Sequence, residues 1–304
     1  MKFFMKNVIK KIPGVSKAYK YYRSIRDARF QDSESLNQQI QKILVNQYIE
    51  AAAKKSLPYK DIGSAGFRCY SQFEEDGIIL YVLSCIGMKT KKVVEICIGD
   101  GKECMATNLV LNHGFRGFMF DGDPQNIETA RKFFLSKKDC LLTPPYFRAA
   151  WITKDNVNDL LVKAGATGEV DVLSLDIDGN DYWIWEAIDV IQPRLCVFET
   201  HNVIPSNLSL TIPYKADFNC WEKDGHEQDF RSVSLLAMKK LSEKKGYRLI
   251  GAHKHGFNVF FLRNDIALDL FPELSIDTVH DNLWTELAQK ERWPAVKDMP
   301  WKKV

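Results

Sequence analysis

The chain alternates between short segments rich in β-branched and aromatic residues and longer segments whose apolar residues recur every three or four positions. The short segments predict β-strands, and the longer ones predict amphipathic helices. The predicted strands span residues 92–98, 117–121, 147–152, 170–176 and 194–199. The predicted helices span residues 103–113, 125–136, 154–164, 182–189 and 233–245. Because strands and helices alternate, we expect βαβ units and a doubly wound α/β fold with a mainly parallel sheet.

Both ends of this alternation differ from its middle. On the N-terminal side, residues 32–57 predict a helix, and Ser71 is expected to cap the next helix, with Glu74 completing a capping box. On the C-terminal side, residues 247–253 and 257–263 predict a terminal antiparallel strand pair. We therefore divide the chain into a basic amphipathic arm, a helical extension, the α/β domain and a C-terminal extension without clear period, at residues 1–31, 32–69, 70–265 and 266–304.

Composition places the chain among ordinary globular proteins. Hydrophobic residues make up 45% and charged residues 27% of the sequence. No apolar run reaches the length of about 18 residues that predicts a membrane-spanning helix. Seven cysteines without a C-x-x-C pair are typical of reduced thiols rather than of a disulfide framework or a zinc site. These observations predict a cytoplasmic protein.

The net charge of +3 is unevenly distributed along the chain. Residues 1–31 contain nine basic side chains and one acidic side chain, a net charge of +8, so the remainder carries −5. The same arm holds apolar residues at near-helical spacing, namely Phe3, Phe4, Val8, Ile9 and Ile12. If this arm forms a basic amphipathic helix, it is expected to bind peripherally to the anionic inner face of the cell membrane. The alternative is a solvated arm without membrane contact. Nucleic acid is not an expected partner, because no aromatic and basic platform occurs elsewhere.

Candidate cofactor chemistry appears where the first predicted strand ends. The strand opens into Gly99-Asp100-Gly101 before a helix, and glycine lets a ligand approach the backbone closely. Asp121 ends the second strand about 20 residues later, the spacing used for ribose recognition. Asp123 precedes a proline, so it suits either a ligand or a helix cap. Cys104 stands where a dinucleotide fingerprint needs a third glycine, which disfavours a nicotinamide cofactor.

Three motifs in order resemble the FkbM-type branch of class I methyltransferases. They are the run Glu95-x-Cys97-x-Gly99-x-Gly101, the acid-tipped second strand and the run Asp176-Ile177-Asp178-Gly179. The resemblance covers roughly residues 70–265 and departs from the family at Cys97, where glycine is usual. It implies S-adenosylmethionine as methyl donor, held by cofactor-binding residues Glu95, Gly99, Gly101, Asp121, Asp123 and Trp151. For Trp151 a place in the core is the alternative to contact with the adenine.

Candidate catalytic residues follow the fourth and fifth predicted strands. Asp176 and Asp178 end the fourth strand, and Glu199 and His201 end the fifth. Neighbouring strands lie about 4.8 Å apart, so these side chains can converge. Methyl transfer to a hydroxyl requires alignment and proton removal, for which Asp178 or His201 is the candidate base. The alternatives are turn chemistry at Asp178, a solvent loop at His201 and an Mg²⁺ site built from the carboxylates.

The long segment at residues 202–231 is rich in aromatic residues and predicts an acceptor-binding lid, with a second small core as the alternative. Taken with the basic arm, the resemblance implies O-methylation of a glycan, a glycolipid or a related small-molecule hydroxyl. A nicotinamide-dependent oxidoreductase and a non-catalytic nucleotide-fold scaffold remain as other hypotheses.

Overall fold

The computed structural model describes residues 35–222 and 225–304. Two compact units divide the chain, Met1–Gln47 and Tyr48–Val304. The basic arm predicted at residues 1–31 lies outside the described residues. The helix predicted over residues 32–57 is present over residues 35–53. Within the described part of the chain, no helix is both long and apolar enough to cross a membrane.

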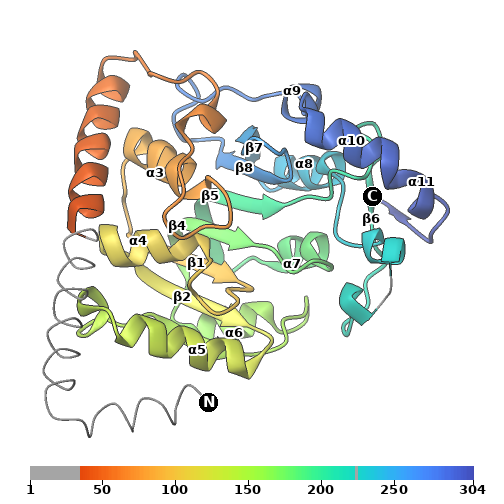
Figure 1. Cartoon of the computed structure of the whole chain (residues 1–304), viewed down its shortest axis with the longest axis horizontal. Coiled ribbons are helices and arrows are strands. Elements are labelled where there is room, and N and C mark those ends of the chain that lie inside the picture. Colours follow the sequence, from red (N-terminus) through yellow and green to blue (C-terminus); the bar gives the residue numbers. More distant parts are fainter. Residues whose placement is uncertain (1–34, 223–224) are drawn as a thin grey trace, which may run out of the picture. The chain divides into compact units, whose positions relative to one another are not determined.

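A seven-stranded sheet forms the centre of the second unit, with strand order β3-β2-β1-β4-β5-β8-β7 (Figure 1). The strands are β1 Lys92–Ile96, β2 Arg116–Asp121, β3 Tyr146–Ala149, β4 Gly168–Leu175, β5 Ile191–Glu199, β7 Tyr247–Ala252 and β8 Asn258–Arg263. The first five are parallel, whereas β8 runs antiparallel to both β5 and β7. Strand order reverses between β1 and β4, where ligands bind in open α/β sheets. The predicted doubly wound α/β fold and its terminal antiparallel pair are confirmed.

Helices connect the parallel strands, as crossover connections require. They are α3 Glu75–Ile86 before β1, α4 Met105–His113, α5 Pro124–Leu135, α6 Val157–Ala164, α7 Asp181–Ala187 and α8 Leu235–Lys244. Beyond the sheet, the C-terminal residues form α9 Ile276–His280, α10 Leu283–Glu291, α11 Trp293–Val296 and β9 Lys302–Lys303. The strand β9 pairs with β6, Leu210–Thr211, in a separate two-stranded sheet.

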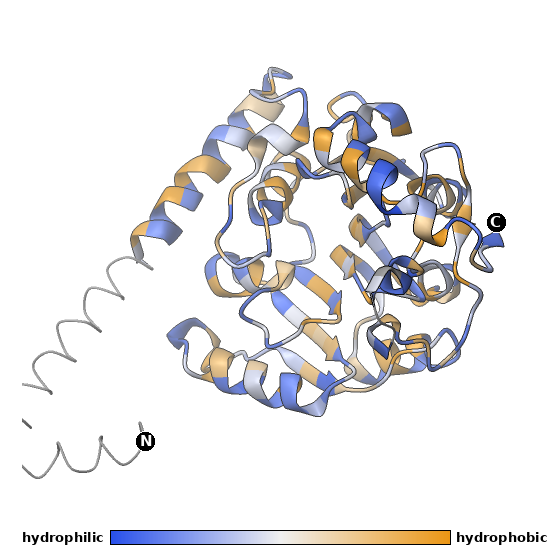
Figure 2. Ribbon diagram, turned by 45° about the vertical axis from the view of Figure 1, so that its right-hand side comes forward, coloured by the Kyte–Doolittle hydropathy of each residue, from blue (hydrophilic) through white to orange (hydrophobic). Residues whose placement is uncertain are grey.

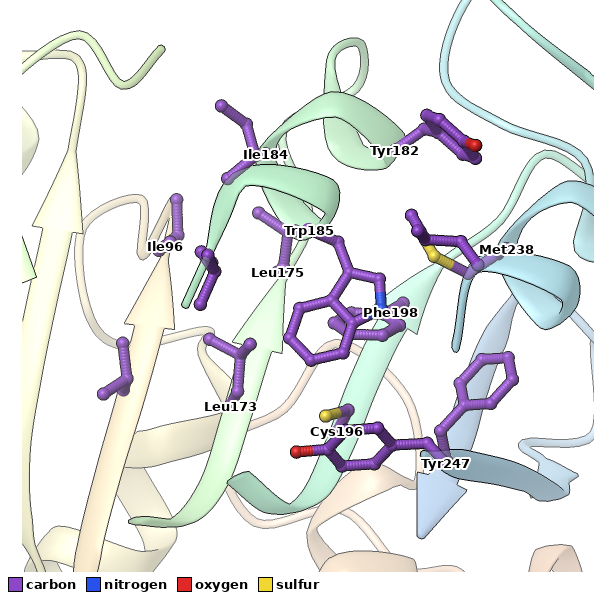
Figure 3. Packing of buried hydrophobic residues seen from close by; sticks show 14 of the residues in the cluster. Ile96, Leu173, Leu175, Tyr182, Ile184, Trp185, Cys196, Phe198, Met238 and Tyr247 are labelled. Carbon is purple, nitrogen blue, oxygen red and sulfur yellow. The ribbon is translucent and has the colours of Figure 1, made fainter. Parts of the chain in front are cut away.

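Alternate residues of each strand face opposite sides of the sheet. On one side, residues such as Leu175 and Phe198 pack with α6, α7 and α8 in a single apolar core. Figure 3 shows Trp185 of α7 beside Phe198 of β5, with ring centroids 5.1 Å apart. On the other side, the residue Glu95 of β1 reaches the first turn of α4. Burial on both faces explains why the central strands read as continuous apolar runs.

The start of α3 differs from the predicted capping box. The residue before the helix is Glu74, whose side chain makes no cap hydrogen bond. Instead, Asp76 in the first turn accepts the backbone N–H groups of Cys69, Tyr70 and Ser71 at 2.7, 2.6 and 2.8 Å. The N–H of Asp76 in turn donates to Ser71 Oγ at 3.1 Å. The predicted capping box is therefore wrong for Glu74, because Ser71 accepts a first-turn N–H of the helix as expected but Asp76 makes the reciprocal bond.

A second, smaller core lies beside the segment that follows β5. Its buried members come from that segment and from the C-terminal helices, namely Val203, Ile212, Phe230, Ala288 and Val296. Phe230 packs edge-on against Trp301, with ring centroids 4.6 Å apart. Part of the aromatic content of residues 202–231 thus fills a second small core, which was the alternative to an acceptor-binding lid.

Candidate active site

The glycine loop after β1 is fixed by a buried carboxylate. Glu95 is 4% exposed and accepts the N–H groups of Met105 and Ala106 at 2.9 and 2.6 Å, so it caps α4. Gly101 has φ +72°, and an added Cβ there would lie 2.8 Å from Ala130 Cβ. Glu95 therefore fixes the loop through its bonds to the start of α4, whereas the sequence predicted a direct contact with the cofactor.

Gly99 is the point where the loop faces open space. Its φ is +55°, and an added Cβ would meet no atom within 4 Å. The Gly99 N–H donates to Asp121 Oδ2 at 2.8 Å. This bond ties the loop after β1 to the end of β2. The open side of Gly99 leaves room for a ligand close to the backbone.

The two aspartates after β2 have different tasks. Asp121 is 4% exposed, and its Oδ1 accepts the N–H of Asp123 at 2.8 Å and Nδ2 of Asn126 at 3.1 Å. Asp123 is exposed, and its Oδ1 accepts the N–H of Gln125 at 2.8 Å as the N-cap of α5. The structure thus gives Asp123 the capping role and places Asp121 against the glycine loop.

Trp151 lies on the surface beside the end of β2. Its side chain is 52% exposed, so the alternative of a core tryptophan is wrong. An added Cβ at Gly122 would lie 2.9 Å from Trp151 Cε3, which places the indole directly against this turn. Its Nε1 donates to the carbonyl of Ala216 at 2.7 Å. An exposed, anchored ring of this kind suits stacking against a planar base.

Cys97 follows β1 in the left-handed conformation, with φ +72°, and its side chain is exposed. This backbone region costs a side chain about 1–2 kcal/mol and favours glycine. Partial desolvation, with a further contribution from Asp176 and then Asp121, raises the pKa of the Cys97 thiol. The thiol is therefore protonated at neutral pH, and it occupies the position where the resembling family has glycine.

Three carboxylates converge where β4 and β5 end. One oxygen from each of Asp176, Asp178 and Glu199 lies within 4.8 Å of the others, and we call these residues the carboxyl cluster. Asp176 and Glu199 hydrogen-bond to each other. Burial, followed for Asp176 by the charge of Glu199, raises the pKa of both groups above the usual range. The pair consequently keeps one shared proton near neutral pH.

An ion pair completes the cluster. Arg231 Nη1 lies 3.0 Å from Asp178 Oδ1, and the guanidinium carbon lies 5.3 Å from the centre of the Trp221 ring. Asp178 has φ +52°, a conformation that aspartate tolerates better than most residues. The sequence did not point to Arg231. Its only signal was a single basic residue at the end of an aromatic segment, and its partner Asp178 is far away along the chain.

The turn that carries Asp178 is rigidly supported. Asp181 accepts the N–H groups of Ile177 and Gly179 at 2.8 and 3.0 Å and the Ser232 hydroxyl at 3.1 Å. Burial, and then the charge of Asp176, raises the pKa of Asp181 to about 7. An added Cβ at Gly179 would lie 2.7 Å from the Phe218 ring, so that ring covers the turn. The position of Asp178 is therefore set by its neighbours rather than by a free loop.

His201 does not join the carboxyl cluster. It is 3% exposed, and its Nε2 donates to the carbonyl of Asp229 at 2.8 Å. Burial, and then the charge of Arg231, lowers the pKa of His201 to about 3. A neutral, buried imidazole whose Nε2 holds a backbone carbonyl is poorly placed to take a proton from a substrate. The structure removes His201 from the candidate bases, because the chain turns inward after Thr200.

Residues 212–216 are held across this site by their backbone. Trp183 Nε1 donates to the carbonyl of Ile212 at 2.9 Å, and Asn180 Nδ2 donates to that of Lys215 at 2.8 Å. The Trp151 bond to Ala216 is the third such anchor. We call residues 212–216 the clasped segment. It joins the end of β3 to the start of α7, so the surroundings of Trp151 and the turn that carries Asp178 are physically connected.

The solved structures to which this chain is similar are distant in sequence. No family model matches the chain, and no curated protein matches it. The N-terminal domain of EvdMO1 with S-adenosylhomocysteine bound is 11% identical at a TM-score of 0.44, over 72% of this chain and 96% of that chain. Magnesium protoporphyrin IX methyltransferase from Synechocystis, with S-adenosylmethionine bound, is 10% identical at 0.38, over 62% and 77%. An S-adenosylmethionine-dependent methyltransferase from Clostridium acetobutylicum is 11% identical at 0.38, over 60% and 87%.

Proposed function

We propose that this protein is an S-adenosylmethionine-dependent O-methyltransferase of the FkbM type, acting on a hydroxyl of a glycan, a glycolipid or a related small molecule. One observation carries the proposal. The loop at Gly99, tied to Asp121 and open to a ligand, lies at the same sheet edge as a carboxyl pair that shares a proton. Methyl transfer to a hydroxyl requires a binding site for the methyl donor and a nearby base whose pKa is close to neutral.

The residues present fit the donor. Gly99 leaves open space for the amino-acid portion, and Trp151 offers an exposed ring for the adenine. Asp121 uses its carboxylate for three hydrogen bonds, which leaves one of about four acceptor sites for a ribose hydroxyl. When bound, the donor supplies an electrophilic methyl group. The tasks left to this chain are to hold the acceptor in line and to remove its proton.

Proton removal falls to the carboxyl pair. A base is most effective when its pKa lies near the working pH, and burial raises the pKa of Glu199 to about 7. Asp176 holds the shared proton through its hydrogen bond to Glu199. Asp178 is neutralised by Arg231 and lies within reach of the pair. In this scheme Glu199 accepts the hydroxyl proton, and Asp176 and Asp178 set its charge and orientation.

A metal-assisted mechanism is the second candidate. Carboxylate oxygens are the ligands that Mg²⁺ prefers, and the carboxyl cluster supplies three. The Arg231 guanidinium already pairs with Asp178 Oδ1 and partly offsets the negative charge that would draw a cation. This contact favours the metal-free scheme. Loss of methyl transfer on chelation and its return with Mg²⁺ would establish the metal-assisted one.

The helix over residues 35–53 and the basic sequence before it support a substrate at an anionic membrane face. On the helix over residues 35–53, Leu36, Ile40 and Ile43 are 58%, 49% and 58% exposed at helical spacing, and hydrophobic and hydrophilic stretches alternate along this helix in Figure 2. The sequence immediately before it carries the charge of +8. Apolar contact beside basic residues is the usual basis of peripheral binding to anionic lipid. We therefore expect a glycan or glycolipid acceptor made at the cytoplasmic membrane face.

Calorimetric titration of the full chain with S-adenosylmethionine, S-adenosylhomocysteine and NAD tests the donor. Incubation with tritiated donor and fractionated cell lipids and polysaccharides then tests the acceptor. Glu199→Gln should bind the donor normally and lose methyl incorporation by about 10²- to 10⁴-fold, the contribution of a general base. Tight binding of NAD without binding of the methyl donor would replace this proposal with an oxidoreductase. Donor binding without turnover on any fraction would favour the scaffold hypothesis.

A further inference from the structure

Arg231 has more hydrogen-bonding capacity than its surroundings use. Its side chain is 16% exposed, one face lies over Trp221, one terminal nitrogen pairs with Asp178, and the side chain also hydrogen-bonds to Cys220. Its Nε is buried without a hydrogen-bond partner. Leaving a charged donor buried and unpaired is costly, so packing alone does not explain an arginine here. The side chain has a task that depends on its charge.

The charge near the cluster follows from the contacts. Asp176 and Glu199 share a proton and together carry one negative charge. Asp178 carries a second negative charge, and Arg231 carries one positive charge 3.0 Å away. The carboxyl cluster and Arg231 together therefore carry one net negative charge. Without Arg231 the cluster would carry two.

The donor and the product of the proposed reaction differ in charge at one atom. S-adenosylmethionine carries a positive sulfonium, whereas S-adenosylhomocysteine carries a neutral thioether. We infer that the Arg231–Asp178 ion pair sets how strongly the site prefers the charged donor over its uncharged product, an inference that rests on the proposed function. Arg231 is then a specificity-determining residue, because it limits the attraction of the carboxyl cluster for the sulfonium without removing it.

There is a physical reason to limit the negative charge near the sulfonium. Two opposite charges a few ångströms apart attract strongly in a partly buried site, and two net negative charges would hold the donor cation more tightly than one. Binding that favours the donor ground state lowers KM without raising kcat. A single net negative charge keeps enough attraction to bind the donor in preference to its product. It also allows the sulfonium charge to disappear during transfer at a smaller electrostatic cost.

The wild-type protein and four variants test the inference by calorimetry with the donor and the product in turn. Arg231→Gln removes the positive charge, and we expect the ratio of product Kd to donor Kd to rise roughly tenfold. Asp178→Asn removes the negative charge and should lower that ratio roughly tenfold. Asparagine tolerates the positive φ at this position, so the backbone should be preserved. The double variant restores the wild-type net charge and should restore the wild-type ratio.

Arg231→Lys is the matched control, because it keeps the charge and should keep the ratio while losing the planar contact with Trp221. A purely structural role predicts something different, since single variants would weaken both ligands alike and the double variant would be the weakest. Ratios that stay at the wild-type value in both single variants would overturn the inference while leaving the proposed function intact. Failure of the wild-type protein to bind either ligand would instead reject the proposed function itself.

Discussion

The two aspartates after β2 provide the sharpest test of the donor site, because they are two residues apart and the structure gives them different tasks. Asp121→Asn keeps the shape of the side chain but places an amide where a carboxylate accepts three donors, including the Gly99 N–H at 2.8 Å. Hydrogen bonds to a charged group contribute about 1.5–3 kcal/mol. If the loop loses one such bond, the loop conformation that binds the donor becomes less stable by about that free energy. Donor affinity should then drop about 10- to 150-fold.

Asp123→Ala is the control for this prediction. It removes one hydrogen bond, to the Gln125 N–H, at the exposed N-cap of α5. A lost cap lowers the free energy of unfolding by about 0.5–2 kcal/mol. We therefore expect a lower melting temperature and a donor Kd within about twofold of the wild type. Calorimetry on both variants, with thermal denaturation to confirm folding, decides the matter. Equal loss of affinity in the two variants, or none in Asp121→Asn, would refute this division of tasks.

Three further predictions concern stability. Arg194→Met should lower the free energy of unfolding by up to about 3–5 kcal/mol in chemical denaturation without changing donor Kd, because buried Asp171 loses its ion-pair partner and keeps only its bonds from the N–H groups of residues 89–91. Asp181 has a pKa raised to about 7, so its contribution to stability is fully present below its unfolded pKa and is lost as pH rises toward 7. Denaturation at pH 5 and pH 8 should show this loss in the wild type and a smaller one in Asp181→Asn. Gly101→Ala should lower the melting temperature, because the new Cβ lies 2.8 Å from Ala130 Cβ at φ +72°.

The sheet could be predicted from the sequence because its central strands are buried on both faces. The observed ends of the strands differ from the predicted ends where tertiary contacts determine them. Prediction began the fifth strand after Pro193, whereas β5 starts at Ile191, since a proline is tolerated near the first residues of a strand. Prediction extended the third strand to residue 152, whereas β3 ends at Ala149. The chain leaves the sheet there because Trp151 turns outward to bond Ala216.

The site could be predicted only in part, for a related reason. Parallel strands end at one sheet edge, so Asp176 and Glu199 were expected to meet, and one oxygen of each lies within 4.8 Å of the other. His201 shows the limit of this reasoning, because no local pattern reveals that the chain turns inward after Thr200, whose N–H bonds the Phe257 carbonyl at 2.8 Å. Arg231 was missed because its pairing with Asp178 joins segments far apart in the sequence. Contacts between segments far apart in the sequence leave no periodic pattern along the chain.

The clasped segment is held by its backbone, and this affects how its sequence can change during evolution. Its three anchors, Trp151, Asn180 and Trp183, all donate to main-chain carbonyls, which every amino acid possesses. Lys215 and Ala216 are exposed, so their side chains can change without removing any of these bonds. Point mutations on the segment therefore alter the surface offered to an acceptor while its anchoring stays intact. Under the proposed function, descendants of this protein can acquire new acceptors one residue at a time and keep the same donor site.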